Sequence, residues 1–219
     1  YIGIEASAGG LEALETLFKN TPEDTDLIFI VIQHLSPDYK SFMKELLSKH
    51  TSIPVQVVED GMIAEPNNIY LIPPQKNLSI FDGKLILENQ NQNASLKLPI
   101  DIFFRSLAKD KGSSSVGIIL SGTGNDGTLG IKAIKEAGGI TIVQDEHTAK
   151  FDGMPKSAIA TGLVDYVLSP EEIPAELLSF AKNSFLINST KSPKISNSHL
   201  NGISKILKAS SCFFPSEGL

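Results

Sequence analysis

The feature that most constrains the fold of this chain is the alternation of short apolar runs with amphipathic helical patterns. Residues 1–6, 27–33 and 116–121 are apolar and rich in β-branched residues or leucine, which is typical of buried parallel strands. Amphipathic helical patterns follow the first two runs, and further helices are predicted over residues 101–109 and about 128–137. The alternation predicts an α/β fold: a doubly wound, mainly parallel sheet with helices on both faces.

One segment departs from the alternation and predicts a hairpin. The apolar runs LSIF and KLIL are separated by Asp82-Gly83, a pair that favours the tight turn between antiparallel strands. We therefore expect an antiparallel hairpin at one edge of the sheet, or beyond that edge. The polar residues 88–97 that follow predict a loop.

The C-terminal part of the chain differs from the rest in composition. Ser169 and Glu172 form a capping-box pattern, which predicts a helix that ends near Lys182. Beyond this point serine, asparagine and lysine dominate, and they offer little apolar surface for a core. We therefore expect a domain over residues 1–182 and a linker or tail toward a downstream domain over residues 183–219.

Composition and charge exclude several classes of protein. The 219 residues include 19 Lys and Arg against 25 Asp and Glu, and the formal net charge of −6 argues against nonspecific nucleic-acid binding. Cys212 is the only cysteine, which rules out a disulfide within the chain and favours the cytoplasm. No apolar run is long enough to cross a bilayer. The histidines show no metal-ligand spacing with cysteine or carboxylates.

Three polar residues follow three of the predicted strands: Ser7, His34 and Asp126. The loops at the carboxyl ends of parallel strands share one edge of the sheet, so these side chains can meet there. A hydroxyl, an imidazole and a carboxylate are the nucleophile, base and orienting acid of a hydrolytic triad. Each residue also has a simpler explanation. Ser7 can cap a helix, His34 can be an ordinary loop histidine, and Asp126 can be a turn residue. The glycine-rich loop over 121–127 also fits a phosphate site, although no Walker lysine follows it.

These stretches resemble a known family, the chemotaxis protein-glutamate methylesterases (the CheB catalytic domain). The resemblance runs in family order over about residues 1–180, and it includes IEASAGGLEAL, VIQHLSPDYKSFMKELL, GIILSGTGNDGTLGIKAIKEAGG and VQDEHTAKFDGMPKSAIATGLVDYVLSPEEIP. The motifs SAGG, QHLSPD and AKFDGMP are most similar to those of the methylesterase domain in hybrid proteins that also carry a CheR methyltransferase. No stretch resembles the receiver domain that precedes this domain in ordinary family members.

The resemblance implies an activity and its catalytic residues. The family hydrolyses glutamate 5-methyl esters on chemoreceptors and releases methanol, with glutamine deamidation as a related reaction, in chemotaxis signalling controlled by a phosphorelay. Its nucleophile, base and acid correspond to Ser7, His34 and Asp126. The resemblance implies no cofactor and no metal. The expected partners are the cytoplasmic domain of a methylated chemoreceptor and a fused or separate CheR-type methyltransferase, with the protein outside the membrane.

Four further residues are candidates for binding the substrate, and two of them, Ala8 and Thr123, match positions of the family. Ala8 follows the nucleophile and Thr123 lies three residues before the acid, where backbone N–H groups can face an oxyanion. Gly9 leaves room for substrate beside them. Arg105, in the matched segment IDIFFRSLA, is a candidate for orienting an acidic receptor helix and is equally well explained as a solvated helix residue.

Glu5 departs from the pattern of the family, which usually has glycine two residues before the nucleophile. We expect Glu5 to adopt an ordinary β conformation and to reduce hydrolysis without abolishing it, so that Glu5→Gly raises the rate. Two other functions stay open on the sequence: a noncatalytic interaction module of a hybrid signalling protein, and a domain that binds phosphate or a nucleotide.

Overall fold

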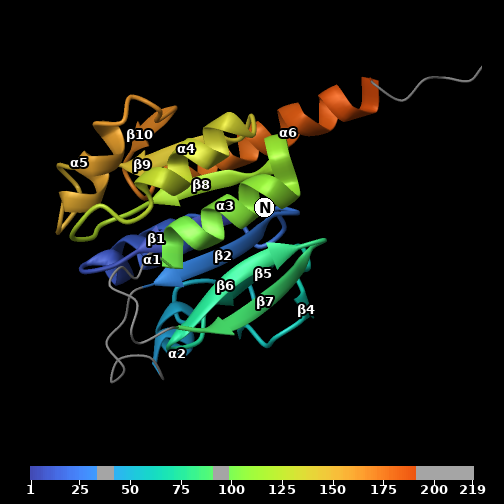
Figure 1. Ribbon diagram of the computed structural model, residues 1–219, viewed down its shortest axis with the longest axis horizontal. Coiled ribbons are helices and arrows are strands. Elements are labelled where there is room, and N and C mark those ends of the chain that lie inside the picture. Colours follow the sequence, from blue (N-terminus) through green and yellow to red (C-terminus); the bar gives the residue numbers. More distant parts are fainter. Residues whose placement is uncertain (34–41, 91–98, 191–219) are drawn as a thin grey trace, which may run out of the picture. The chain divides into compact units, whose positions relative to one another are not determined.

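The structure of the protein is a computed structural model (Figure 1), and the residues it describes are 1–33, 42–90 and 99–190. Over residues 183–190 it describes the backbone alone. By their contacts the residues form two compact units, 1–181 and 182–219. The described part of the second unit, residues 182–190, is helical. The fold described below is that of the first unit.

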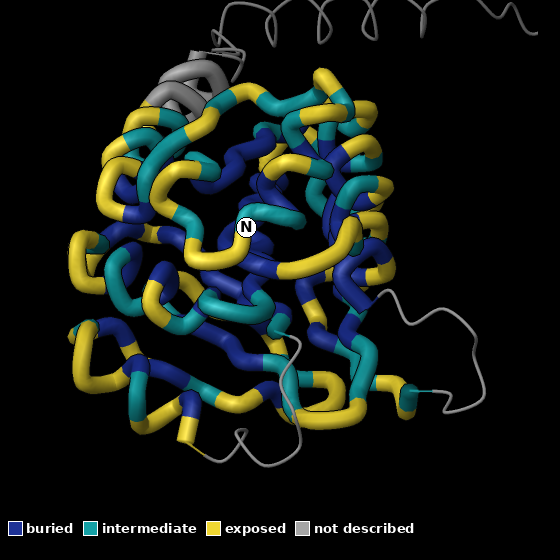
Figure 2. Tube along the Cα trace, turned by 90° about the vertical axis from the view of Figure 1, so that its left-hand side faces the viewer, coloured by how far each residue is buried: buried dark blue, intermediate teal, exposed yellow. Residues whose placement is uncertain are grey.

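Seven parallel strands form the main sheet, in the order β10-β9-β8-β1-β2-β5-β3. The strands are apolar and β-branched, as the sequence predicts, because helices bury both of their faces. Their bounds are β1 Ile2–Ala6, β2 Ile28–Gln33, β3 Val55–Val57, β5 Asn68–Leu71, β8 Val116–Ile119, β9 Ile140–Gln144 and β10 Tyr166–Leu168. Figure 2 shows the buried residues concentrated inside the unit. The prediction of a doubly wound, mainly parallel sheet is confirmed.

The helices divide between the two faces of this sheet. The buried core on one face includes side chains of α1, α2 and α6, and the core on the other includes side chains of α3, α4 and α5. In α1 the apolar stripe is buried, and Phe18 packs edge-on against Phe29 of β2 with 5.4 Å between ring centroids. The bounds are α1 Gly10–Lys19, α2 Met43–Leu47, α3 Pro99–Lys111, α4 Thr128–Glu136, α5 Gly153–Ile159 and α6 Ile173–Thr190, with a 3₁₀ turn η2 at Gly112–Ser114.

The predicted hairpin is present and belongs to a second, smaller sheet. Strands β6 (Lys76–Phe81) and β7 (Lys84–Asn89) are antiparallel, and β4 (Met62–Ile63) pairs with β7. Asp82 and Gly83 both have positive φ, at 50° and 74°, as a tight two-residue turn requires. The hairpin is tied to α3, because the Asp82 N–H donates to the Asp110 carboxylate at 2.6 Å.

Helix α6 is longer than the sequence pattern predicts. The carboxylate of Glu172 accepts hydrogen bonds from the N–H and the hydroxyl of Ser169, at 3.0 and 2.7 Å, and the helix begins at Ile173. The sequence predicted an end near Lys182, but the helix continues to Thr190. No glycine or proline lies between these two positions, so the change to polar composition does not by itself end the helix.

The order of the main sheet reverses between β1 and β8. The chain adds β2 and β5 on one side of β1, and it returns to place β8, β9 and β10 on the other side. Such a reversal opens a crevice outside the carboxyl ends of the two strands beside it. The segments that follow β1 and β8 are therefore where the fold is expected to form a ligand site.

Candidate active site

Ser7 lies in the turn that joins β1 to α1, at the point of reversal. Its N–H donates to the Ser121 carbonyl at 3.0 Å, which extends the pairing of β1 with β8 by one step. The N-cap residue of α1 is Gly9, with φ 71°, and no side chain caps this helix. The structure therefore does not support the simpler explanation of Ser7 as a helix cap.

Glycine at position 122 lets the two loops approach each other. A Cβ atom added at Gly122 would lie 2.9 Å from the Cβ atom of Ser7, and it would also collide with the Met154 side chain. Real Cβ atoms do not approach this closely, so a side chain at this position would push the loops apart. The glycine-rich segment after β8 thus brings its backbone directly beside the serine.

A network of hydrogen bonds that the sequence did not predict holds these loops together. The Ser121 hydroxyl donates to the Ala8 carbonyl at 2.9 Å and accepts from the Phe151 N–H at 3.0 Å. The Ser121 N–H donates to Oε1 of Gln144, at 2.8 Å. Both Ser121 and Gln144 are buried polar residues at the ends of apolar strands, and that position is the signal that could have identified them.

Asp126 occupies the loop between β8 and α4, next to the start of α3. Its Oδ1 accepts from the N–H of Gly127 at 2.9 Å and from the N–H of Asp101 at 3.3 Å. In return, Oδ1 of Asp101 accepts from the N–H of Gly130 in the first turn of α4, at 2.7 Å. The Asp126 carboxylate therefore lies at the N-terminal end of α3 and the Asp101 carboxylate at that of α4, where the helix dipole favours negative charge.

Glu5 lies beneath these two carboxylates and is fully buried. It belongs to β1 and has no positive φ, so the predicted β conformation is confirmed. Both of its carboxylate oxygens lack a hydrogen-bond partner among the described residues. Burial raises the pKa of Glu5 well above its ordinary value, and the nearby charges of Asp126 and Asp101 raise it further.

Asp101 has a raised pKa as well. Its burial is the largest cause, and the charge of Asp126 adds to it, while the hydrogen bond from Gly130 and the charge of Arg105 act in the opposite direction. Arg105 itself is exposed on α3. Its charge lowers the pKa of Asp101, an electrostatic interaction that the sequence did not predict.

The candidate oxyanion residues lie in the two loops that meet at the reversal. Ala8 and Gly9 are half-buried in the turn after Ser7, and Thr123 is exposed in the loop after β8. No described residue accepts a hydrogen bond from the N–H of Ala8 or of Thr123. These two donors are therefore available to a ligand as far as the described residues are concerned.

His34, the predicted base, lies outside the described residues. The preceding residue, Gln33, is the last residue of β2 and pairs with Ala6 of β1. The chain therefore leaves β2 at the same level of the sheet at which β1 leads into Ser7.

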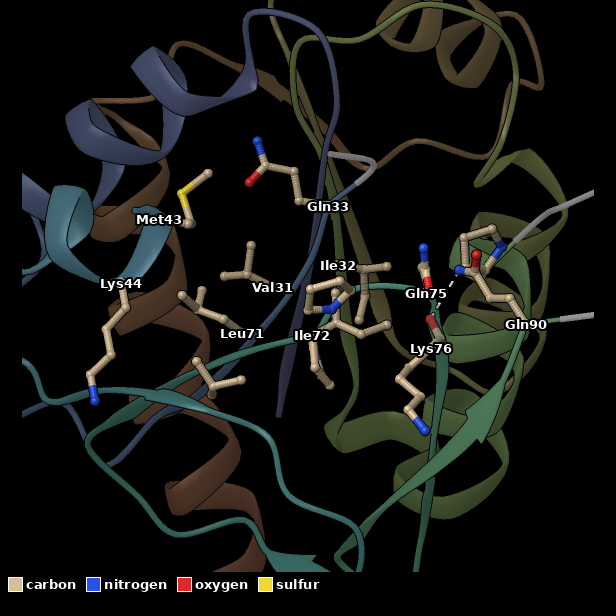
Figure 3. Close-up of a pocket in the computed structure, with 14 residues that line it drawn as sticks. Val31, Ile32, Gln33, Met43, Lys44, Leu71, Ile72, Gln75, Lys76 and Gln90 are labelled. Atoms are coloured by element: carbon tan, nitrogen blue, oxygen red, sulfur yellow. Dashed lines mark hydrogen bonds between the residues drawn. The ribbon is translucent and has the colours of Figure 1, made fainter. Parts of the chain in front are cut away.

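A cavity of about 220 Å³ lies beyond the carboxyl ends of β2 and β5 (Figure 3). Val31, Leu71 and other apolar side chains form its floor, and Lys44 of α2 and Lys76 of β6 also line it. The Lys76 amine donates to Oδ1 of Asn89 at 2.6 Å. On one side the amide of Gln90 donates to the Lys76 carbonyl at 3.0 Å. The cavity adds a partly apolar, partly polar hollow to the edge of the sheet that carries Ser7.

The described residues contain neither a candidate metal site nor a helix that could cross a membrane. No group of His, Cys, Asp and Glu in this part of the chain is arranged to hold a metal ion. Among the helices that the structure describes, none has the length and apolar character needed to span a membrane.

Comparison with known proteins gives a consistent result. The family model described as "CheB methylesterase" matches residues 2–177. The crystal structure of the CheB methylesterase catalytic domain of Thermotoga maritima superposes with a TM-score of 0.75 and 30% sequence identity. That match covers 81% of this chain and 96% of the other.

Two relatives match more than half of this chain. A protein-glutamate methylesterase/protein-glutamine glutaminase of Methanococcus maripaludis is 34% identical over 184 residues, which is 82% of this chain and 50% of the relative. An uncharacterized 104.1 kDa protein of Rhodobacter capsulatus is 47% identical over 131 residues, which is 60% of this chain and 14% of that protein. The chain thus spans at most about half the length of these relatives.

Proposed function

This chain belongs to the CheB methylesterase family, and from that premise we propose that it is a protein-glutamate methylesterase. It hydrolyses glutamate 5-methyl esters on the cytoplasmic domains of chemoreceptors, with release of methanol, and deamidation of glutamine side chains is a related reaction of the same site. The observation that carries the proposal is the contact of the Ser7 turn with the Asp126-bearing loop at the reversal of the sheet.

The proposed mechanism uses a Ser-His-Asp triad. His34 takes the proton of the Ser7 hydroxyl as its oxygen attacks the ester carbonyl, and it then passes this proton to the departing methanol. Water, activated by His34, hydrolyses the resulting acyl-enzyme, which releases glutamate and restores the serine. Asp126 orients the imidazole and stabilises its cationic form.

The backbone around Ser7 supports the proposed stabilisation of the reaction intermediate. The N–H groups of Ala8 and Thr123 have no acceptor among the described residues, and they lie in the two loops that meet beside the serine. We assign them to the oxyanion hole, with Gly9 leaving space for the substrate chain. Arg105, exposed on α3, is assigned to contact with the acidic receptor segment.

The wider setting of this domain is also part of the proposal. We assign residues 1–182 to the methylesterase domain and residues 183–219 to a linker toward a further domain, in a cytoplasmic protein that carries or binds a CheR-type methyltransferase. The relative from Rhodobacter capsulatus supports the presence of further domains, because the matching segment is only 14% of that 104.1 kDa protein. Control of the domain through a phosphorelay is expected for chemotaxis signalling.

The test is the release of methanol from a receptor cytoplasmic fragment carrying radioactive methyl esters. The chain should release methanol, and Ser7→Ala should lower the rate by about a thousandfold or more. Ser48→Ala, at an exposed serine of similar size just after α2, is the matched control and should not change the rate. An unaltered rate in Ser7→Ala would refute the proposed nucleophile. Absence of any methanol would favour a noncatalytic module, and thermal stabilisation by phosphate without hydrolysis would favour an anion-binding domain.

A further inference from the structure

Glu5 combines full burial with a carboxyl group that reaches no hydrogen-bond donor among the described residues. We propose that Glu5, in its neutral proton-bearing form, is a positioning residue that supports the Asp126 loop from beneath. The proposal rests on the proposed function, because the role of that loop is to present the acid of the triad. It concerns a position at which the family pattern usually has glycine.

The geometry of β1 directs the Glu5 side chain away from the face of the sheet that α1 covers. Side chains alternate between the faces of a strand, so Gly3 and Glu5 share one face. A Cβ atom at Gly3 would contact Phe103 and Phe104 of α3, which identifies this face as the one covered by α3 and α4. Ile4 and Ala6, in contrast, belong to the core on the other face.

The Glu5 carboxyl packs directly against the loop that carries Asp126. A Cβ atom at Gly127 would collide with Oε2 of Glu5, so the carboxyl fills the space beside the Gly127 backbone. Gly127 has φ 90° and is the N-cap residue of α4. The side chain of Glu5 thus packs against Gly127, the residue that follows Asp126 and caps α4.

The surroundings of Glu5 favour its neutral form. The neighbouring strands pair Glu5 with the apolar residues Ile32 and Ile119. The charged groups that act on it are Asp126 of the loop after β8 and Asp101 of α3, and both are acids. Burial and these like charges both raise its pKa well above its ordinary value, which favours the proton-bearing form.

Loss of this proton would change the site. An ionised Glu5 would place a second negative charge beside Asp126 at a position closed to solvent, and the two charges would repel each other. This repulsion would displace the loop that packs on Glu5, and with it the acid that orients the base. The proposal therefore expects esterase activity to fall at alkaline pH, by about tenfold per pH unit beyond the ionisation of Glu5.

The test compares the pH profiles of the parent protein and Glu5→Gln, which keeps the shape of a neutral carboxyl and cannot ionise. The ratio of the methanol release rate at alkaline pH to the rate at neutral pH should be higher in Glu5→Gln than in the parent. The rate gain expected for Glu5→Gly should therefore appear only in the alkaline range, where the parent carries the ionised carboxylate. Glu136→Gln, at an exposed carboxylate of α4, should keep the parent profile.

A second readout does not depend on catalysis. Unfolded Glu5 ionises near its ordinary value of 4.5, whereas folded Glu5 keeps its proton to a higher pH. Its contribution to stability is therefore complete below 4.5 and is lost as the pH rises toward the folded pKa. Over that window the unfolding equilibrium constant should rise by up to about tenfold per pH unit, in addition to a rise of the same sign from Asp101. Glu5→Gln should remove the share of Glu5 from this slope.

The outcomes separate the two proposals. Equal pH profiles and equal stability slopes in the parent and Glu5→Gln would overturn the role of Glu5 while leaving the methylesterase proposal intact. If no variant releases methanol, the proposed function fails, and the slope of stability against pH alone decides whether Glu5 carries the buried proton. A higher alkaline ratio in Glu5→Gln together with a smaller slope would support the proposal.

Discussion

At the scale of single residues, the site depends on side chains that no local pattern identifies. Ser7 and Asp126 could be predicted because each follows an apolar strand, where polar residues are conspicuous in the sequence. Asp101 could not, because its function depends on the N–H of Gly130 in another helix. The charge of a buried carboxyl such as Glu5 likewise depends on neighbours that only the folded chain supplies.

We expect Asp101→Ala to destabilise the protein by about 1.5–3 kcal/mol, because the change leaves the buried N–H of Gly130 without its charged acceptor. Asp101→Asn keeps an oxygen in reach of the same N–H and should recover most of the loss. Urea unfolding of the three proteins measures the effect. Equal stability of Asp101→Ala and the parent would show that this hydrogen bond does not tie α3 to α4.

At the scale of helices and strands, the sequence predicted the existence of elements better than their ends. The stripe of α1 and the turn at Asp82-Gly83 are strong local signals, and both predictions are confirmed. The predicted end of α6 near Lys182 was wrong. Polar composition was interpreted as a stop signal, although no glycine or proline lies between Lys182 and Thr190 to break the helix. The small sheet was only partly predicted, since the pairing of β4 with β7 is nonlocal.

The core contacts of α6 lead to a prediction about truncation. Ile173 and Leu177 are buried in the core, and Phe180 packs against it. A chain that ends after Asn183 retains these contacts and should melt at nearly the same temperature as the full chain. Leu177→Ala should in contrast cost about 2–5 kcal/mol, because it leaves a cavity in the core.

Differential scanning calorimetry of the truncated chain and of Leu177→Ala distinguishes the two effects. A large drop in melting temperature on truncation would contradict the assignment of residues 183–219 to a linker. It would mean that this segment contributes to the stability of the domain.

At the scale of the whole molecule, function follows from the order of the strands. The alternating pattern predicted a doubly wound sheet, but it did not predict that β8 would lie beside β1, which determines where the reversal falls. That adjacency places the loop of Asp126 beside the turn of Ser7, although the two are far apart in the sequence. The third predicted member, His34, comes after β2 in the sequence and lies outside the described residues.

The central claim is that Ser7 and His34 act as one catalytic unit, and a double-mutant cycle on methanol release tests it most directly. Ser7→Ala and His34→Ala should each lower the rate by about a thousandfold or more, and the double variant should be little slower than either single one. Near-parent urea unfolding curves for all three variants would show that the fold is intact. If the two losses instead multiply, or if either single variant retains the parent rate, the residues do not form a triad and the account of this site is wrong.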